Sequence, residues 1–356
     1  MTVLLRSALH TISNCHRRNI SHVIHRKNAS DESDKLTDLS DQLSRLTIQR
    51  DKETLSLAWL RQAVAFVDKS WKHVFSALAD TNCSERERKR FESYLEDALS
   101  LLDVCNGLKE LLNDSLQYAM LVSYAARIGL DLKEATDNDA KAELLRLLNA
   151  LHKSVELMNM KEEENGRHGE SRSKFETCSS LLRSIGEHVH LCSPRCRWDD
   201  FSEADNAMYG AKVAAIFFGN VLALSLTVKP PRRFSLVPIK VKLSWLQDLD
   251  HIQQNLKDLT DGCIERGDIF LLKELDAVRV DAAKLQSTVI NLCEADNMPP
   301  SEADRAALTA ECKKLSLEAD SLYEGLLLIQ RHLDDLFRTL LNVRVGLVSK
   351  VCNIWA

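Results

Sequence analysis

The segment LTAECKKLSLEADSLYEGLLLIQRHLDDLFRTLLNVRVGL, from Leu308 to Leu347, decides the fold of this chain. Its apolar residues recur alternately four and three positions apart, the heptad spacing of a helix that packs against other helices along its length. Further apolar residues widen this stripe. The widening favours packing inside a multi-helix bundle over a coiled-coil dimer, the alternative that the same spacing allows. These widening residues are Leu327, Leu328, Phe337 and Leu341.

The same helical periodicity runs through most of the remaining sequence. Apolar residues three and four positions apart extend from Leu57 to Leu78, from Trp245 to Cys263 and from Leu271 to Leu292. No glycine precedes Gly107 and no proline precedes Pro194, so helix breakers are absent from the first hundred residues. The sequence therefore predicts an all-α fold. We expect an elongated multi-helix bundle with long heptad-patterned helices, whose C-terminal helix closes against the helices that begin near Trp245 and Leu271.

Composition divides the chain into four parts. Residues 1–34 form a basic leader, 35–160 form the N-terminal part of the bundle, and 161–200 hold a charged linker, a short helix and a Cys/His loop. Residues 201–356 form the C-terminal part, with an apolar central helix at 207–228. We expect 35–160 and 201–356 to build one composite bundle.

Glycine also suggests where helices of the N-terminal part end. We expect one helix from about Arg86 to Gly107, and a next helix from Leu108 that stops near Gly129. A fourth runs from Leu144 to Met160 and fades into the charged linker.

The overall composition narrows the class of protein. The chain has 356 residues, of which 45% are hydrophobic and 28% charged, so it can bury a substantial core. Its net charge of −5 argues against a nucleic-acid binder. Its ten cysteines are scattered, mostly on apolar stripes, and nothing resembles a secretory signal peptide. Free thiols in a reducing compartment are therefore expected.

The first thirty residues contain no acid, but they hold five basic residues, several serines and four histidines. That composition is typical of a transit peptide for a plastid or a mitochondrion. A disordered basic leader on a cytoplasmic protein is the alternative.

A gap in the acidic residues marks the middle of the chain. No carboxylate lies between Asp205 and Asp248, and this window begins with an apolar run from Val213 to Val228. The run could span a bilayer, lie peripherally on a membrane, or form the core helix of the bundle. A basic cluster follows it and predicts contact with an anionic membrane surface or an acidic partner. The cluster consists of Lys229, Arg232, Arg233, Lys240 and Lys242.

Ser235 lies inside this cluster, two residues after paired arginines. Kinases directed by basic residues favour that arrangement. A phosphate on Ser235 would cancel local positive charge and release a membrane contact.

The segment HVHLCSPRC contains the sharpest candidate for metal chemistry. Its two imidazoles and two thiolates, from His188, His190, Cys192 and Cys196, could complete a tetrahedral zinc site. Because the spacing is unorthodox and no second CxxC pair is present, an accidental cluster is the competing interpretation. The sequence has no phosphate-binding glycine loop, GxSxG, HExxH or EF-hand motif, so we expect no enzyme and no cofactor.

Three segments together resemble the plant BYPASS family of helical proteins. They are SYLEDALSLLDVCNGLKELL (Ser93 to Leu112), NAMYGAKVAAIFFGNVLALSL (Asn206 to Leu226) and LDDLFRTLLNVRVGLVS (Leu333 to Ser349). The resemblance runs from about Leu55 to the C-terminus, and it includes neither the basic leader nor the LCSPRC stretch. It implies a plant-specific protein without established catalytic chemistry, linked to control of growth and of a root-derived mobile signal.

The resemblance also implies candidate partners and a location. A related branch of the family is associated with exocyst components, and members are often predicted to hold one membrane segment. We therefore expect a non-enzymatic regulatory or scaffold protein in the cytoplasm, membrane-associated or single-pass, that acts through helical surfaces. The alternatives are a zinc-binding sensor or enzyme, and a helical protein imported into an organelle.

Overall fold

A computed structural model describes nine segments of the chain. They are residues 39–46, 55–80, 85–132, 137–166, 174–190, 202–228, 244–266, 269–294 and 300–352. The chain divides into two compact units, Met1–Asp38 and Leu39–Ala356, and all of the described residues belong to the second. The basic leader thus lies outside the described residues.

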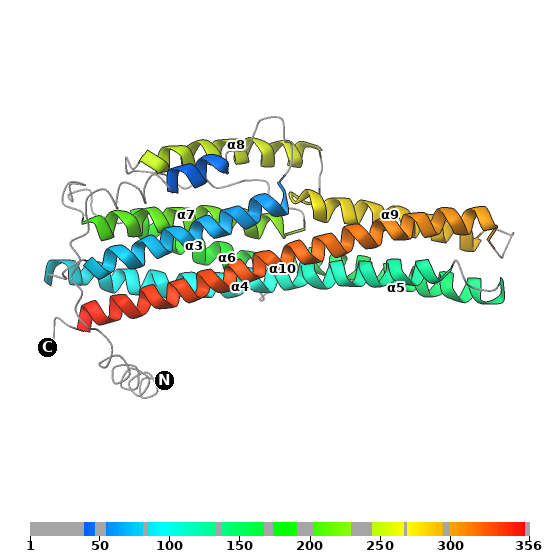
Figure 1. Ribbon diagram of the computed structural model, residues 1–356, viewed down its shortest axis with the longest axis horizontal. Coiled ribbons are helices and arrows are strands. Elements are labelled where there is room, and N and C mark those ends of the chain that lie inside the picture. The colour runs from blue at the N-terminus through cyan, green and yellow to red at the C-terminus, as the bar shows by residue number, and fades with distance from the viewer. Residues whose placement is uncertain are drawn as a thin grey trace. The chain divides into compact units, whose positions relative to one another are not determined.

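The described part of the chain is helical (Figure 1). A short helix at 39–45 precedes α3. Within the described residues, the only pairing of strand type is an isolated bridge between Leu55 and Leu272. The predicted all-α multi-helix fold is confirmed. The helices are α3 (Leu57–Asp80), α4 (Glu85–Asp131), α5 (Asp137–Gly166), α6 (Lys174–His190), α7 (Glu203–Ser225), α8 (Ser244–Arg266), α9 (Lys273–Glu294) and α10 (Glu302–Cys352).

Helix α10 lies alongside α4 and α3 and makes its largest contacts with them (Figure 1). All twelve positions of its predicted apolar seam are buried, from Leu308 at one end to Leu347 at the other. Burial of one such leucine contributes roughly 1.5–3 kcal/mol, so this seam is a main source of the bundle's stability. Polar contacts fix its register, because Thr339 Oγ1 donates a hydrogen bond of 2.6 Å to Asp68 Oδ1 of α3.

The predicted partners of α10 were partly wrong. Helix α9, which carries the Leu271 stripe, packs on α10 as expected, but the principal partners are α4 and α3. Helix α8, which carries the Trp245 stripe, packs on α7 instead. The reason is the Trp245 side chain, which lies edge-on to Phe66 of α3 at 5.7 Å and covers Gly210 of α7.

The predicted break at Gly107 is also wrong. Helix α4 is a single helix of 47 residues that runs through Gly107 without interruption. A Cβ atom at this position would collide with the Cys178 sulfur of α6. The glycine therefore permits close packing of two helices, and tertiary contacts outweigh its unfavourable helix propensity.

Candidate functional site

Helix α7 contains the apolar run that the sequence left open to three interpretations. Among the described residues it is the helix long and apolar enough to cross a membrane, judged by length and composition. In the structure 89% of its apolar window is buried by the rest of the bundle. A capping box of Ser202 and Asp205 begins the helix. The structure thus places α7 as a core helix, the third of the three interpretations.

A buried ion pair joins α7 to α4. Lys212 Nζ lies 2.6 Å from Asp97 Oδ2, and the two side chains are only 5% and 1% exposed. The same ammonium lies 4.9 Å from the centre of the Tyr94 ring. Burying two charges costs free energy that their attraction and their remaining hydrogen bonds must offset, so the pair demands one geometry.

About two turns before Lys212 on α7, Asp205 gathers donors from α4 and from the start of α7. Arg90 Nη1 and the Tyr94 hydroxyl, both on α4, donate to it at 2.8 and 3.0 Å. The backbone N–H and hydroxyl of Ser202 donate to the same carboxylate at 3.1 and 2.9 Å. Tyr94 therefore lies between two buried charged groups of α7. We call Arg90, Tyr94, Asp97, Asp205 and Lys212 the polar cluster.

Sequence reasoning missed the polar cluster. It treated Asp205 as the edge of a window without acids and Lys212 as an interruption of an apolar run. A usable signal was present, because Lys212 is the single Lys or Arg in α7 and has alanine and valine as neighbours. A lone charge on such a helix predicts a buried partner of opposite sign on another helix.

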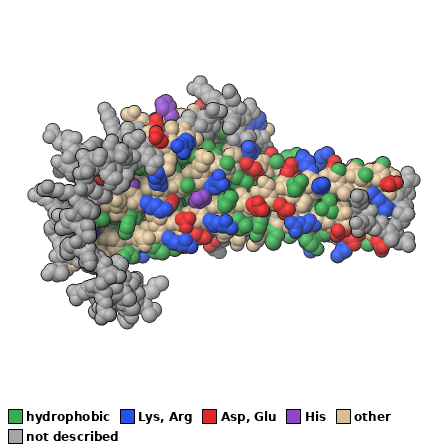
Figure 2. Space-filling model, viewed as in Figure 1, with side chains coloured by type: hydrophobic (Ala, Val, Ile, Leu, Met, Phe, Trp, Pro, Cys, Tyr) green, Lys and Arg blue, Asp and Glu red, His purple; other side chains and the backbone are tan. Residues whose placement is uncertain are grey.

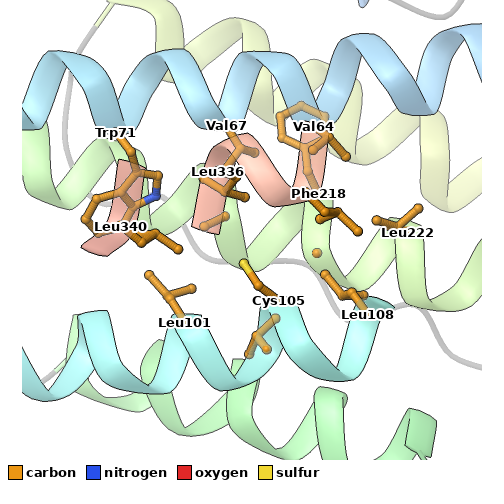
Figure 3. A pocket seen from close by; sticks show the side chains of 14 residues that line it. Val64, Val67, Trp71, Leu101, Cys105, Leu108, Phe218, Leu222, Leu336 and Leu340 are labelled. Carbon is orange, nitrogen blue, oxygen red and sulfur yellow. The ribbon is translucent and has the colours of Figure 1, made fainter. Parts of the chain in front are cut away.

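A small apolar cavity lies where α3, α4, α7 and α10 meet. It has a volume of about 30 Å³, and Figure 3 shows Trp71, Leu101, Cys105 and Phe218 around it. The buried Trp71 Nε1 has no hydrogen-bond acceptor within the described part of the chain. The volume suffices for about one water molecule and is far below the roughly 300–1,000 Å³ of a pocket for a drug-sized ligand.

Three buried cysteines carry thiols whose reactivity is suppressed by burial. Burial raises the pKa of Cys105 to about 12 and that of Cys178 to about 11. Burial raises the pKa of Cys312 to about 12 as well. Because the thiolate is the nucleophile and the metal ligand, these three side chains are inert at neutral pH.

The predicted metal and membrane sites lie outside the described residues. His188 and His190 end α6, where their side chains are not described, and Cys192 and Cys196 follow in an undescribed segment. The basic cluster and Ser235 fall between 229 and 243, likewise undescribed. The proposed zinc ligands, basic membrane contact and phosphorylation site stay predictions. Within the described segments, no group of three or more His, Cys, Asp and Glu side chains could hold a metal ion.

An open groove of about 570 Å³ lies between α4 and α10. It is lined by Arg127 of α4 and by residues between Asp320 and Arg331 of α10, none of which belongs to the polar cluster. Acidic, basic and apolar side chains alternate over the face that carries α10 (Figure 2). Exposed large apolar residues occur on both helices: Leu99, Met120 and Tyr124 on α4, and Leu317, Leu341 and Val345 on α10. Contiguous exposed apolar side chains mark surfaces for association, whereas single ones are common on protein surfaces.

Comparison with known proteins gives relatives from plants. The chain is 20% identical over 323 residues to Protein BPS1, chloroplastic, of Arabidopsis thaliana, covering 90% of this chain and 83% of that protein. It is also 20% identical over 245 residues to UPF0496 protein 4 of Oryza sativa, in both subspecies japonica and indica. That match covers 68% of this chain and half of each rice protein.

No family model and no solved structure matches the chain. None of the relatives' names states a catalytic activity. Through these relatives, the chain is similar to BYPASS-related proteins of plants.

Proposed function

We propose that this protein is a non-enzymatic plant regulatory scaffold that binds other proteins through the exposed face of α4 and α10. The observation that supports the proposal is an apolar patch at one end of that face. It consists of Leu99, Leu341 and Val345, which are 45%, 39% and 40% exposed. We call these three residues the Leu99 patch.

An ion pair indicates that the three residues lie at the same level along the two helices. Lys109 Nζ lies 2.6 Å from Asp334 Oδ1, which sets α4 against α10 at this level. Farther along, Ser123 donates to Asp320 at 2.6 Å, so α4 and α10 run antiparallel. Leu99 precedes Lys109 by ten residues on α4, and residue 344 follows Asp334 by ten residues on α10. Because the helices are antiparallel, Leu99 is level with residue 344. Leu341 and Val345 share one face of α10, being four residues apart.

The Leu99 patch suits a helical segment of a protein partner. Adjacent helices present an apolar strip with polar margins, the arrangement that an amphipathic helix recognises through apolar residues three and four positions apart. The family resemblance makes exocyst components the first partners to examine. Regulation of growth is the biological role that the resemblance suggests for such a scaffold.

The experiment compares partners of three full-length tagged chains in plant cells. The double substitution Leu341→Glu with Val345→Glu places two charges in the patch. Val280→Glu on α9 alters a side chain of similar exposure, 48%, outside it. We expect partners recovered with the unaltered chain and with Val280→Glu, exocyst components among them, to be lost from the double variant. The proposal fails if the double variant is folded and retains the same partners.

Membrane proximity is the second part of the proposal, and the basic cluster from Lys229 to Lys242 supports it. Its cations would contribute roughly 1 kcal/mol each at an anionic surface. Vesicles of anionic phosphatidylserine should bind the chain, and replacing the five cations by glutamine should abolish binding. Binding that survives this replacement or high salt would contradict an electrostatic contact.

Import into an organelle is an alternative for the location. The name of the Arabidopsis relative includes the word chloroplastic, and the basic leader has the composition of a transit peptide. Determination of the N-terminus of the mature chain distinguishes the two cases. A chain that begins near residue 35 indicates import, whereas an intact Met1 indicates a cytoplasmic scaffold.

A further inference from the structure

We infer that the middle of α10 is an antiparallel homodimer interface, in which a second copy of this chain packs about a twofold axis between Leu327 and Leu328. This self-association is separate from the Leu99 patch, which lies farther along α10. The second copy would occupy the α4–α10 groove, whose lining includes Glu324, Leu327, Leu328 and Arg331.

The groove residues share one outward stripe of α10. Asp320, Glu324, Leu327 and Arg331 succeed one another at four, three and four positions, the spacing of neighbours on one helix face. Glu324 and Arg331 are exposed, Asp320 is half-buried, and Leu327 and Leu328 are half-buried at the centre. The core seam of α10 lies on the opposite side, where Leu326 and Ile329 are fully buried. A partner can thus reach this stripe without disturbing the core.

Two of the three charged residues of the stripe are available to a partner. Glu324 and Arg331 form no ion pair with any described residue, although most charged side chains along this part of α10 do. They are seven positions apart, too far to pair with each other on one helix. Opposite charges with an apolar centre between them are the pattern by which helices select a partner and its orientation.

The stripe is complementary to itself in one orientation. Glu324 precedes Leu327 by three positions, and Arg331 follows Leu328 by three positions. In an antiparallel pair, Glu324 therefore faces the partner's Arg331, Arg331 faces the partner's Glu324, and the leucines meet at the centre. A twofold axis requires this reciprocity. A parallel pair would instead set Glu324 against its own copy and Arg331 against its own copy.

The flanking positions accept the same arrangement. Asp320 would face the partner's Asp335, but each aspartate already has an arginine. Arg127 lies 3.2 Å from Asp320, and Arg338 lies 3.1 Å from Asp335. Leu317, which is 64% exposed, would face the partner's Arg338 and be covered by its methylene groups.

Charge reversal tests the inference on the full chain by sedimentation equilibrium. We expect a dimer at micromolar concentration. Arg331→Glu alone and Glu324→Arg alone each place like charges at both reciprocal pairs. Each should raise the dimer dissociation constant about 10- to 100-fold. The double variant, with both charges exchanged, should restore the dimer, as should an equimolar mixture of the two single variants. In a parallel dimer every one of these chains would set like charges against its own copy, so the single variants would not weaken the dimer and the double variant would not differ from them. The mixture pairs opposite charges in either orientation, so the loss in the single variants and the rescue by the double variant establish the antiparallel arrangement.

Lys153→Glu on α5 is the matched control, because Lys153 is exposed and makes no ion pair with described residues. It should leave the dissociation constant unchanged, and circular dichroism should report the same helical content in every variant. The inference is overturned if the chain is monomeric throughout this range, or if it dimerises with equal affinity in all variants. The sedimentation result is independent of the partner-recovery experiment at the Leu99 patch, so the two proposals can fail separately.

Discussion

Lys212 and Asp97 form an ion pair of 2.6 Å at a depth where neither side chain reaches solvent appreciably. The pair joins α7, the most apolar of the described helices, to α4, which also lies along α10. In the bundle both charges are paired. In a lipid environment, Lys212 would leave this carboxylate behind and enter hydrocarbon with a charge, at a cost of at least about 2.5 kcal/mol. The pair therefore holds α7 in the protein core.

Removal of one partner should be more damaging than removal of both. Lys212→Ala leaves Asp97 buried without its cation, and we expect a loss of about 3–5 kcal/mol in the free energy of unfolding. Lys212→Met with Asp97→Leu should cost less than either single truncation. Urea unfolding measures these values. Arg146→Ala is the control, because its pair with Glu143 is on the surface and contributes at most about 1 kcal/mol. Equal losses for control and core variants would contradict the account.

Filling the cavity among α3, α4, α7 and α10 should stabilise the bundle. Val67 lines this cavity, so Val67→Ile places a methylene group in empty space. We expect a gain of up to about 0.8 kcal/mol in the free energy of unfolding. Val74 is equally buried on the same helix but does not line the cavity. Val74→Ile should overpack and cost about 1–3 kcal/mol. Equal thermal shifts in both variants would show that the cavity does not exist.

Gly210 should not tolerate a side chain, whereas Gly262 should. A Cβ at Gly210 of α7 would collide with the Trp245 ring, which Phe66 confines from another side. We expect Gly210→Ala to cost about 1–3 kcal/mol. At Gly262 of α8, the nearest atom is 3.5 Å away at the flexible end of Arg266. Gly262→Ala should gain about 0.5–1 kcal/mol through helix propensity. Thermal unfolding of both variants checks the prediction, and a stable Gly210→Ala variant would refute the close α7–α8 contact.

The buried thiols should make the fold sensitive to alkali. Burial raises the pKa values of Cys105 and Cys312 to about 12, from an ordinary value of 9.0. The unfolded chain therefore loses these protons first as the pH rises. The stability that each thiol contributes is complete below about pH 9. It declines by up to about 1.4 kcal/mol per pH unit until the folded thiol ionises near pH 12.

Comparison of urea unfolding at about pH 8 and about pH 10 isolates this effect. The decline between these conditions should be smaller for Cys105→Ala than for the unaltered chain. Replacement of the exposed Cys352 should leave the decline unchanged. If Cys105→Ala shows the same pH dependence as the unaltered chain, the Cys105 thiol is not buried as described.

Much of the fold could be predicted from apolar spacing. The seam from Leu308 to Leu347 predicted α10 and its buried face, since a repeat of three and four positions fixes one side of a helix. The apolar run predicted a helix but not its surroundings, because lipid and a protein core select the same side chains. Contacts with Asp97 and Trp245, remote in sequence, decide that question in the structure.

Other features depend on long-range contacts that spacing does not encode. Gly107 predicted a helix end because its propensity is poor, yet Cys178 of α6 requires a residue without a side chain there. The polar cluster was missed because Asp97 and Lys212 are separated by 115 positions. The predicted site residues at 188–196 and 229–242 lie where side chains are not described, so their roles stay predictions.

Hydrogen exchange of the full chain, purified without detergent and read by mass spectrometry, tests the central claim that α7 is a core helix. If α7 is held in the bundle by Asp97 and its neighbours, peptides from Ala211 to Leu224 will retain their amide protons as long as those from Leu333 to Leu347 of α10. Exchange in α7 within the first labelling interval, while α10 stays protected, would contradict the claim. So would a chain that leaves membranes only when detergent is added.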